Sequence, residues 1–69
     1  MMHGYRVQIV RLDGTVRNWD GIFAMDGALL EMDEILADPW DSLTYKVDAE
    51  VQIYNAGKRE VVAIQPVRW

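Results

Sequence analysis

The start of the chain has the pattern of a β-hairpin. Residues 5–12 are rich in β-branched and aromatic side chains, which is typical of a strand. Asp13 and Gly14 follow, and this pair is the preferred two-residue hairpin turn because both central positions of a type I′ turn need a positive φ. Residues 15–19 are then expected to return as a second strand.

A two-residue turn fixes which residues of the two strands lie opposite each other. It pairs Leu12 with Thr15 and Val10 with Arg17, and it sorts the apolar side chains into two sets on opposite faces. One set is Val10, Leu12 and Trp19, and the other is Tyr5, Val7, Ile9 and Val16. One helix covers only one face of a sheet. If the second set forms the core, the first set lies outside, joined by Val62 and Ile64. The alternative is a sheet that curls like a barrel and hides both sets.

Residues 25–36 carry the repeat of an amphipathic helix. Apolar side chains recur at three- and four-residue spacing, which gives a stripe about 120° wide at 100° per residue. The stripe consists of Met25, Ala28, Leu29, Met32, Ile35 and Leu36. We expect Asp26 to be the N-cap, where its charge suits the positive end of the helix. Pro39 is expected to end the helix, which leaves Asp38 at the negative end, where an acid is unfavourable.

The second half of the chain predicts another hairpin. Residues 44–54 alternate between apolar and polar positions, as in a half-buried antiparallel strand with one wet face. Residues 55–58 form a loop in which Gly57 is available for the left-handed conformation. Residues 60–69 form the last strand. Because Pro66 cannot donate a ladder hydrogen bond, this strand is expected at an edge or at a bulge.

Together these segments predict an α+β fold in the order β-β-α-β-β. The expected architecture is a four-stranded antiparallel sheet with one helix packed on one face, in a single domain of residues 1–69. Asp20 and Gly21 give a further turn signal before the helix. Residues 22–25 either extend the sheet or lead into the helix, and the pattern leaves the strand order open.

The small size of the chain limits how it can be stabilised. It has 69 residues, no cysteine and one histidine, so disulfides and the common zinc sites are excluded. Below about 70–80 residues a single core rarely supplies more than roughly 3–5 kcal/mol, which leaves efficient packing or a partner. No apolar run approaches the ~20 residues of a membrane helix, and the first residues do not have the pattern of a signal peptide. We expect a soluble, cytoplasmic protein.

Charge changes this picture more than composition does. The net charge of −4 divides into −8 over residues 20–50, with nine acids and one base, and +4 over the rest, with two acids and six bases. An acidic surface of this kind either keeps a small protein soluble or complements a basic partner, whose encounter it would speed. Direct binding of the acidic segment to nucleic acid is disfavoured by charge repulsion.

The residues needed for catalysis are scarce. Nucleophilic catalysis needs a nucleophile, a base and an orienting group, but Ser42 and His3 are the only serine and histidine. Glu31, Asp33 and Glu34 are near in sequence but are expected on the exposed side of the helix rather than in a cleft. The chain has neither a glycine-rich phosphate loop nor an EF-hand spacing. The sequence therefore predicts a protein that is not an enzyme and has no cofactor and no metal.

Two surfaces are candidates for contact with a partner. On the helix, Leu30 falls off the apolar stripe and lies among acids, as in a hot spot with a polar rim. The expected partner-binding residues are Asp26, Leu30, Asp33, Glu34, Asp38, Trp40 and Asp41. The alternative for Trp40 is that it folds back as a lid on the core. On the sheet, Val10, Leu12 and Trp19 would form the interface of a homodimer or of another complex.

The basic residues suggest a third surface. Six cations and three aromatic residues could form a basic aromatic surface for nucleic acid: Arg6, Arg11, Arg17, Lys58, Arg59 and Arg68, with Tyr5, Trp19 and Trp69. Strand alternation places Arg6 and Arg17 on the side of Trp19 and Arg11 on the other. Charges that protect strand edges from aggregation are the simpler interpretation.

At the level of a class, the chain resembles the small acidic phage-encoded anti-CRISPR inhibitors. The resemblance rests on its size, the absence of cysteine and of catalytic residues, the acidic segment from Asp20 to Asp41 and the compact α+β layout. It implies stoichiometric inhibition in the host cytoplasm, by docking on a positively charged nucleic-acid-binding surface of a CRISPR effector subunit. Asp26, Asp33, Glu34, Asp38 and Asp41 would then imitate phosphates, with Leu30 or Trp40 as the apolar anchor. The alternatives are an assembly subunit that dimerises through its sheet and a nucleic-acid-binding β-sheet module.

Overall fold

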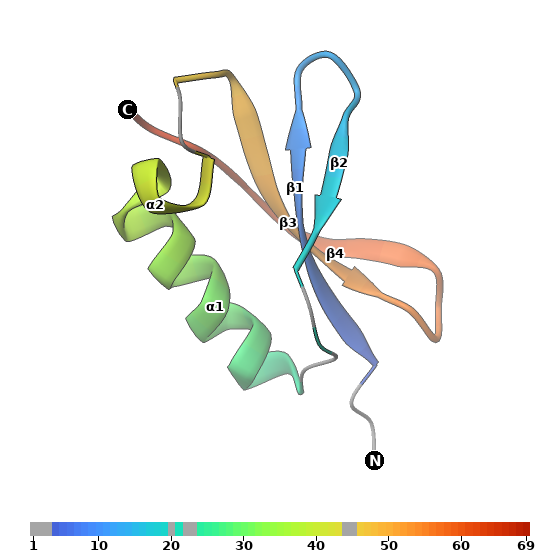
Figure 1. Ribbon diagram of the computed structural model, residues 1–69. Helices are drawn as coiled ribbons and strands as arrows, with labels where there is room; N and C mark the ends of the chain where they lie inside the picture. Colours follow the sequence, from blue (N-terminus) through green and yellow to red (C-terminus); the bar gives the residue numbers. More distant parts are fainter. Residues whose placement is uncertain (1–3, 20, 22–23, 44–45) are drawn as a thin grey trace.

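The computed structural model describes residues 4–19, 21, 24–43 and 46–69 (Figure 1). The predictions for His3, Asp20, residues 22–23 and residues 44–45 lie outside the described residues. The elements are β1 (Tyr5–Arg11), β2 (Val16–Asn18), α1 (Met25–Ala37), α2 (Pro39–Leu43), β3 (Ala49–Asn55) and β4 (Glu60–Pro66).

The four strands form one open antiparallel sheet in the order β2-β1-β3-β4, with α1 on one side of it (Figure 1). This confirms the predicted α+β class and the four-stranded sheet with a helix on one face. The two hairpins, β1–β2 and β3–β4, join through the central pair β1–β3. Since the sheet is open, with β2 and β4 at its edges, the barrel alternative is wrong.

The register of the first hairpin differs from the prediction by one residue. Val10 lies opposite Val16 rather than Arg17, because the loop between the strands has three residues instead of two. The Arg11 N–H donates to the Thr15 carbonyl oxygen at 2.9 Å, and the Gly14 N–H donates to the Arg11 carbonyl oxygen at 2.9 Å. Gly14 adopts φ 91°, the left-handed conformation that a three-residue hairpin loop needs at its last position.

This shift moves the whole of β2 to the other face, because side chains alternate along a strand. Trp19 therefore shares the helix side with Val7 and Ile9, and it packs against the core. Val16 shares the outer side with Val10 and is exposed. The prediction that Val10, Leu12 and Trp19 lie on one face was wrong.

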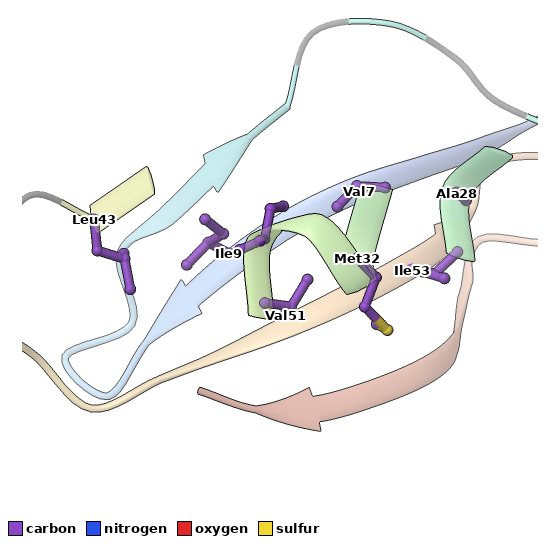
Figure 2. Packing of buried hydrophobic residues seen from close by; sticks show 8 residues of the cluster. Val7, Ile9, Ala28, Met32, Leu43, Val51 and Ile53 are labelled. Atoms are coloured by element: carbon purple, nitrogen blue, oxygen red, sulfur yellow. The ribbon is translucent and has the colours of Figure 1, made fainter. Parts of the chain in front are cut away.

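The core lies between the helices and the two central strands (Figure 2). It consists of Val7 and Ile9 from β1, Val51 and Ile53 from β3, Ala28, Met32 and Ile35 from α1, and Leu43 from α2. The helical stripe is thus confirmed at its centre and, half-buried, at Met25 and Leu36. Leu29 departs from it, because it is 43% exposed. At 100° per residue Leu29 lies about 120° from Ile35, at the margin of the stripe.

The helix begins and ends for different reasons. Its N-cap is Ala24, which makes no side-chain capping bond, so the prediction of Asp26 as N-cap was wrong. Asp26 lies in the first turn, where its charge still suits the helix end, and its Oδ1 accepts the Gly27 N–H at 2.9 Å. At the other end α1 stops at Ala37, ahead of Pro39 as predicted.

The short helix α2 was not predicted. Pro39 is its first residue, a position that suits proline because the first helical N–H groups have no partner within the helix. Asp38 is consequently both the C-cap of α1 and the residue that precedes α2, and its carbonyl oxygen accepts the Asp41 N–H at 3.3 Å. An acid that is unfavourable at the end of α1 therefore lies beside the favourable end of α2.

The second hairpin is shorter than predicted. Strand β3 begins at Ala49 rather than at residue 44, and β4 ends at Pro66. In the loop the left-handed position belongs to Arg59, with φ 56°, and not to Gly57. The register shifts at Val62, because Ile53 pairs with Ala63 while Tyr54 pairs with Val61. Strand β4 is an edge strand, as Pro66 predicted, and its bulge lies at Val62 rather than at Pro66.

Candidate functional site

The outward side of α1 carries the acids that the sequence singled out. Asp26, Leu30, Asp33 and Glu34 are all exposed, and we refer to these four residues as the acidic helix face. At 100° per residue the first three fall within an arc of about 60°, and Glu34 lies about 40° beyond it. This arc lies opposite the buried residues of α1, so the acidic helix face points away from the sheet.

Two leucines accompany these acids. Leu30 is 62% exposed, as predicted, and Leu29 beside it is partly exposed as well. Complete burial of a leucine side chain stabilises a complex by about 1.5–3 kcal/mol. Two exposed leucines therefore lie beside the acids on the outward side of α1. Leu29 was missed as a surface residue because its spacing matched the apolar stripe.

Asp38, Trp40 and Asp41 are exposed beyond the end of α1. Trp40 is 54% exposed, so the alternative that it acts as a lid on the core was wrong. Its ring instead meets Trp69 edge to face, with 4.6 Å between the ring centroids and 66° between the planes. The Trp69 indole N–H donates to the Val47 carbonyl oxygen at 2.8 Å, which fixes that ring.

Glu31 does not belong to the acidic helix face. It is half-buried, and its Oε1 accepts the Trp19 indole N–H at 2.6 Å. The Arg17 guanidinium carbon lies 4.9 Å from the centroid of the Trp19 ring, within the range of a cation–π contact. Sequence reasoning missed this cluster because the wrong hairpin register placed Trp19 on the far side of the sheet.

The proposed sheet interface is not a single patch. Leu12 is exposed at the tip of the first hairpin, Val10 lies half-buried on the outer face, and Trp19 lies on the helix side. Gln8 of β1 and Gln52 of β3 lie opposite each other on the outer face, and Gln8 Nε2 donates to Gln52 Oε1 at 2.8 Å. The centre of this face is therefore polar.

A hollow of about 460 Å³ opens beside the tip of the first hairpin. Its lining includes Leu12, Gly14, Asp48 and Glu50, which offer two carboxylates and no nucleophile. In the part of the chain that the structure describes, no three histidine, cysteine or acidic side chains gather closely enough to hold a metal ion.

The basic residues are also divided differently from the prediction. Arg17 shares the helix side with Trp19, and Arg11 lies on that side as well, because it pairs with Ala49 two positions beyond Ile9. Arg6 pairs with Tyr54 and lies on the outer face. The predicted grouping of Arg6 with Arg17 and Trp19 was wrong.

Comparison of the chain with protein-family models, with curated proteins and with solved structures finds no match in any of the three. Among the described residues no helix has the length and apolar character needed to cross a membrane. The candidate site therefore rests on the geometry and charge of the chain itself.

Proposed function

We propose that the protein is a non-enzymatic inhibitor that binds another protein through the acidic helix face. The proposed target is the positively charged nucleic-acid-binding site of a bacterial defence complex, with a CRISPR effector subunit as the specific candidate. The observation that carries the proposal is the position of Asp26, Asp33 and Glu34 around Leu30 on the outward side of α1.

Charge supports this choice of partner. Residues 20–50 carry a net charge of −8, which steers the chain toward a basic surface and away from nucleic acid itself. Asp26 and Asp33 are seven residues apart, or about 10 Å along the helix axis. The acids thus form a row of negative charge along the helix, which could occupy cation sites that would otherwise hold phosphates.

Charge reversal tests the proposal. The double variant Asp33→Lys plus Glu34→Lys should lose inhibition of DNA binding by a purified CRISPR effector complex by at least about tenfold, because the new lysines repel the basic site. The matched control is Asp48→Lys plus Glu50→Lys, which makes the same change of charge at exposed positions outside the helices. Circular dichroism of each variant checks that the fold is retained.

The two double variants separate a specific surface from net charge. Inhibition that survives in the helix variant, or that falls equally in the control, would contradict the proposal. The nucleic-acid-binding alternative is tested in the same assay without the effector. It requires the wild-type chain to bind a labelled oligonucleotide with an affinity that falls steeply with salt.

A further inference from the structure

Strand β4 has the longest apolar run of the sheet, residues 61–64, and little of it is covered. Val61, Val62 and Ile64 are all exposed, and no residue of β4 is fully buried. Among the described elements, only β3 contacts it. The edge of β4 away from β3 thus lies open along seven residues. A long apolar edge of this kind is a template for pairing with another strand.

The direction of the hydrogen bonds shows which groups this edge offers. The Val67 N–H donates to the Ala49 carbonyl oxygen at 2.9 Å, so Val67 directs its backbone groups toward β3. Backbone groups alternate in direction along a strand. The backbone groups of Ile64 and Pro66 therefore point away from β3, toward the open edge. Their partners in β3, Gln52 and Glu50, likewise direct their own backbone groups toward β1 rather than toward β4. Between the bulge at Val62 and the end of the strand, the open edge offers the Ile64 N–H and two carbonyl oxygens, and the missing N–H of Pro66 leaves no donor unsatisfied.

The charges at the two ends of the strand indicate what fits there. Lys58 and Arg59 precede β4, Arg68 follows it, and all three side chains are exposed. Glu60 is the only acid in residues 58–68, which carry a net charge of +2 in a chain of net charge −4. Between these ends, residues 61–67 hold no charge at all.

We propose that the open edge of β4 binds an extended segment of a partner protein that has apolar residues at its centre and acids at both ends. The segment adds a fifth strand to the sheet, and its acids lie near Arg68 at one end and near Lys58 and Arg59 at the other. From Arg59 to Arg68 an extended strand spans about 30 Å, so the bound segment has about seven to nine residues. Backbone hydrogen bonds supply affinity and the end charges supply register.

A second copy of this chain fits the edge less well. Antiparallel pairing of β4 with itself would place Lys58 and Arg59 of one chain near Arg68 of the other, and like charges in such positions are unfavourable. The inference is independent of the acidic helix face, which lies on a different element. The Asp33→Lys plus Glu34→Lys variant should therefore bind the segment as the wild type does.

The probe is the capped heptapeptide Glu-Val-Thr-Val-Thr-Val-Glu, titrated into ¹⁵N-labelled protein. We expect the largest amide shift and a gain in exchange protection at Ile64. Val16, on the opposite edge of the sheet, should not change. Shifts confined to other elements would overturn the proposal. Protection of Ile64 that rises with protein concentration alone would also overturn it, because it would identify a second copy as the occupant.

Two variants test the backbone contact. Ile64→Pro removes the outward N–H without breaking the ladder to β3 and should weaken peptide binding by about tenfold. The matched control is Val16→Pro, which makes the same change at the other open edge; Val16 is 49% exposed and Ile64 is 50% exposed. Equal affinity of the two variants would contradict edge pairing.

A charge exchange tests the end contacts without altering the strand. The same peptide with lysine at both ends should bind the wild type about tenfold more weakly. Lys58→Glu plus Arg68→Glu should reverse this preference, since the acids of the variant attract the lysine-ended peptide. A preference that the variant does not reverse would show that the end charges do not select the segment.

Discussion

The strands β3 and β4 are neighbours of equal length, yet of the two only β3 contributes fully buried side chains to the core. Strand β4 has the longer apolar run, from Val61 to Ile64, but Val51 and Ile53 of β3 are the residues that lose all contact with solvent. The cause is cover. A helix is about 10–12 Å wide and strands lie about 4.8 Å apart, so one helix covers two strands, and here these are β1 and β3. Position in the sheet, more than apolar content, decides burial.

The largest expected effect comes from equal truncations of the two strands. Ile53→Ala should destabilise the fold by about 2–5 kcal/mol, because it leaves a cavity in a packed core. That loss is comparable with the roughly 3–5 kcal/mol available to a chain of this size, so the variant should be largely unfolded at room temperature. Ile64→Ala should cost about 0.5 kcal/mol. Urea denaturation followed by circular dichroism measures both.

The comparison fails if these two truncations cost the same. A large loss on Ile64→Ala in dilute solution would mean that something covers β4 even in the isolated chain. A small loss on Ile53→Ala would mean that the core relaxes around the deleted group.

The two edges of the sheet differ as well. The chain beyond β2 is tied to α1 by the hydrogen bond from the Trp19 indole N–H to the Glu31 carboxylate, whereas the chain beyond β4 meets α2 only through the ring contact of Trp69 with Trp40 among the contacts described. Trp19→Phe should remove about 1.5–3 kcal/mol of stability, because a hydrogen bond to a charged group contributes more than a neutral one. A double-mutant cycle with Glu31→Ala isolates the pair. A coupling energy near zero would show that packing alone holds this edge.

The smallest effect concerns the two hairpin loops. In the first, Asp13 Oδ1 accepts the Thr15 N–H at 2.9 Å, and in the second Asn55 Oδ1 accepts the Lys58 N–H at 3.1 Å. The backbone hydrogen bond from Thr15 lowers the pKa of Asp13 from its ordinary value of 3.8. Because the folded pKa lies below the unfolded one, this stabilisation is complete above pH 3.8 and is lost as the pH falls through the folded pKa.

Thermal melts check this pH dependence. Asp13→Ala should lower the melting temperature slightly at pH 7, and the difference from the wild type should shrink at pH values below 3.8. Asn55→Ala serves as the control, because its amide does not titrate and its effect should not depend on pH. A constant difference for both variants would exclude the charge of Asp13 as the cause.

The periodicity of apolar residues predicts the helices and strands better than it predicts which residues of paired strands lie opposite each other. The helix from Met25 and both hairpins are local patterns, and the sequence predicts them. The register of β2 depended on a single loop residue, and that one error moved Trp19 to the wrong face and concealed its bond with Glu31. The five-residue helix α2 is too short for any period to show.

The exposed acids were predictable for the same local reason. Asp26, Leu30 and Asp33 follow from helical spacing, whereas the exposure of β4 depends on a strand order that only long-range pairing decides. The contact of Trp40 with Trp69 joins residues far apart in the sequence and has no local signal.

The order β2-β1-β3-β4 also bears on the rate of folding. Each hairpin closes a short loop, but the central pair joins Tyr5 to Asn55 and must bring distant parts of the chain together. The entropy lost in closing a loop grows with its length, and non-local pairing slows folding. The core cannot assemble before this closure, because β1 and β3 carry the buried side chains on which α1 packs. The pairing of β1 with β3 is thus the slowest step of folding, and lengthening the chain between β2 and β3 should slow folding more than it speeds unfolding.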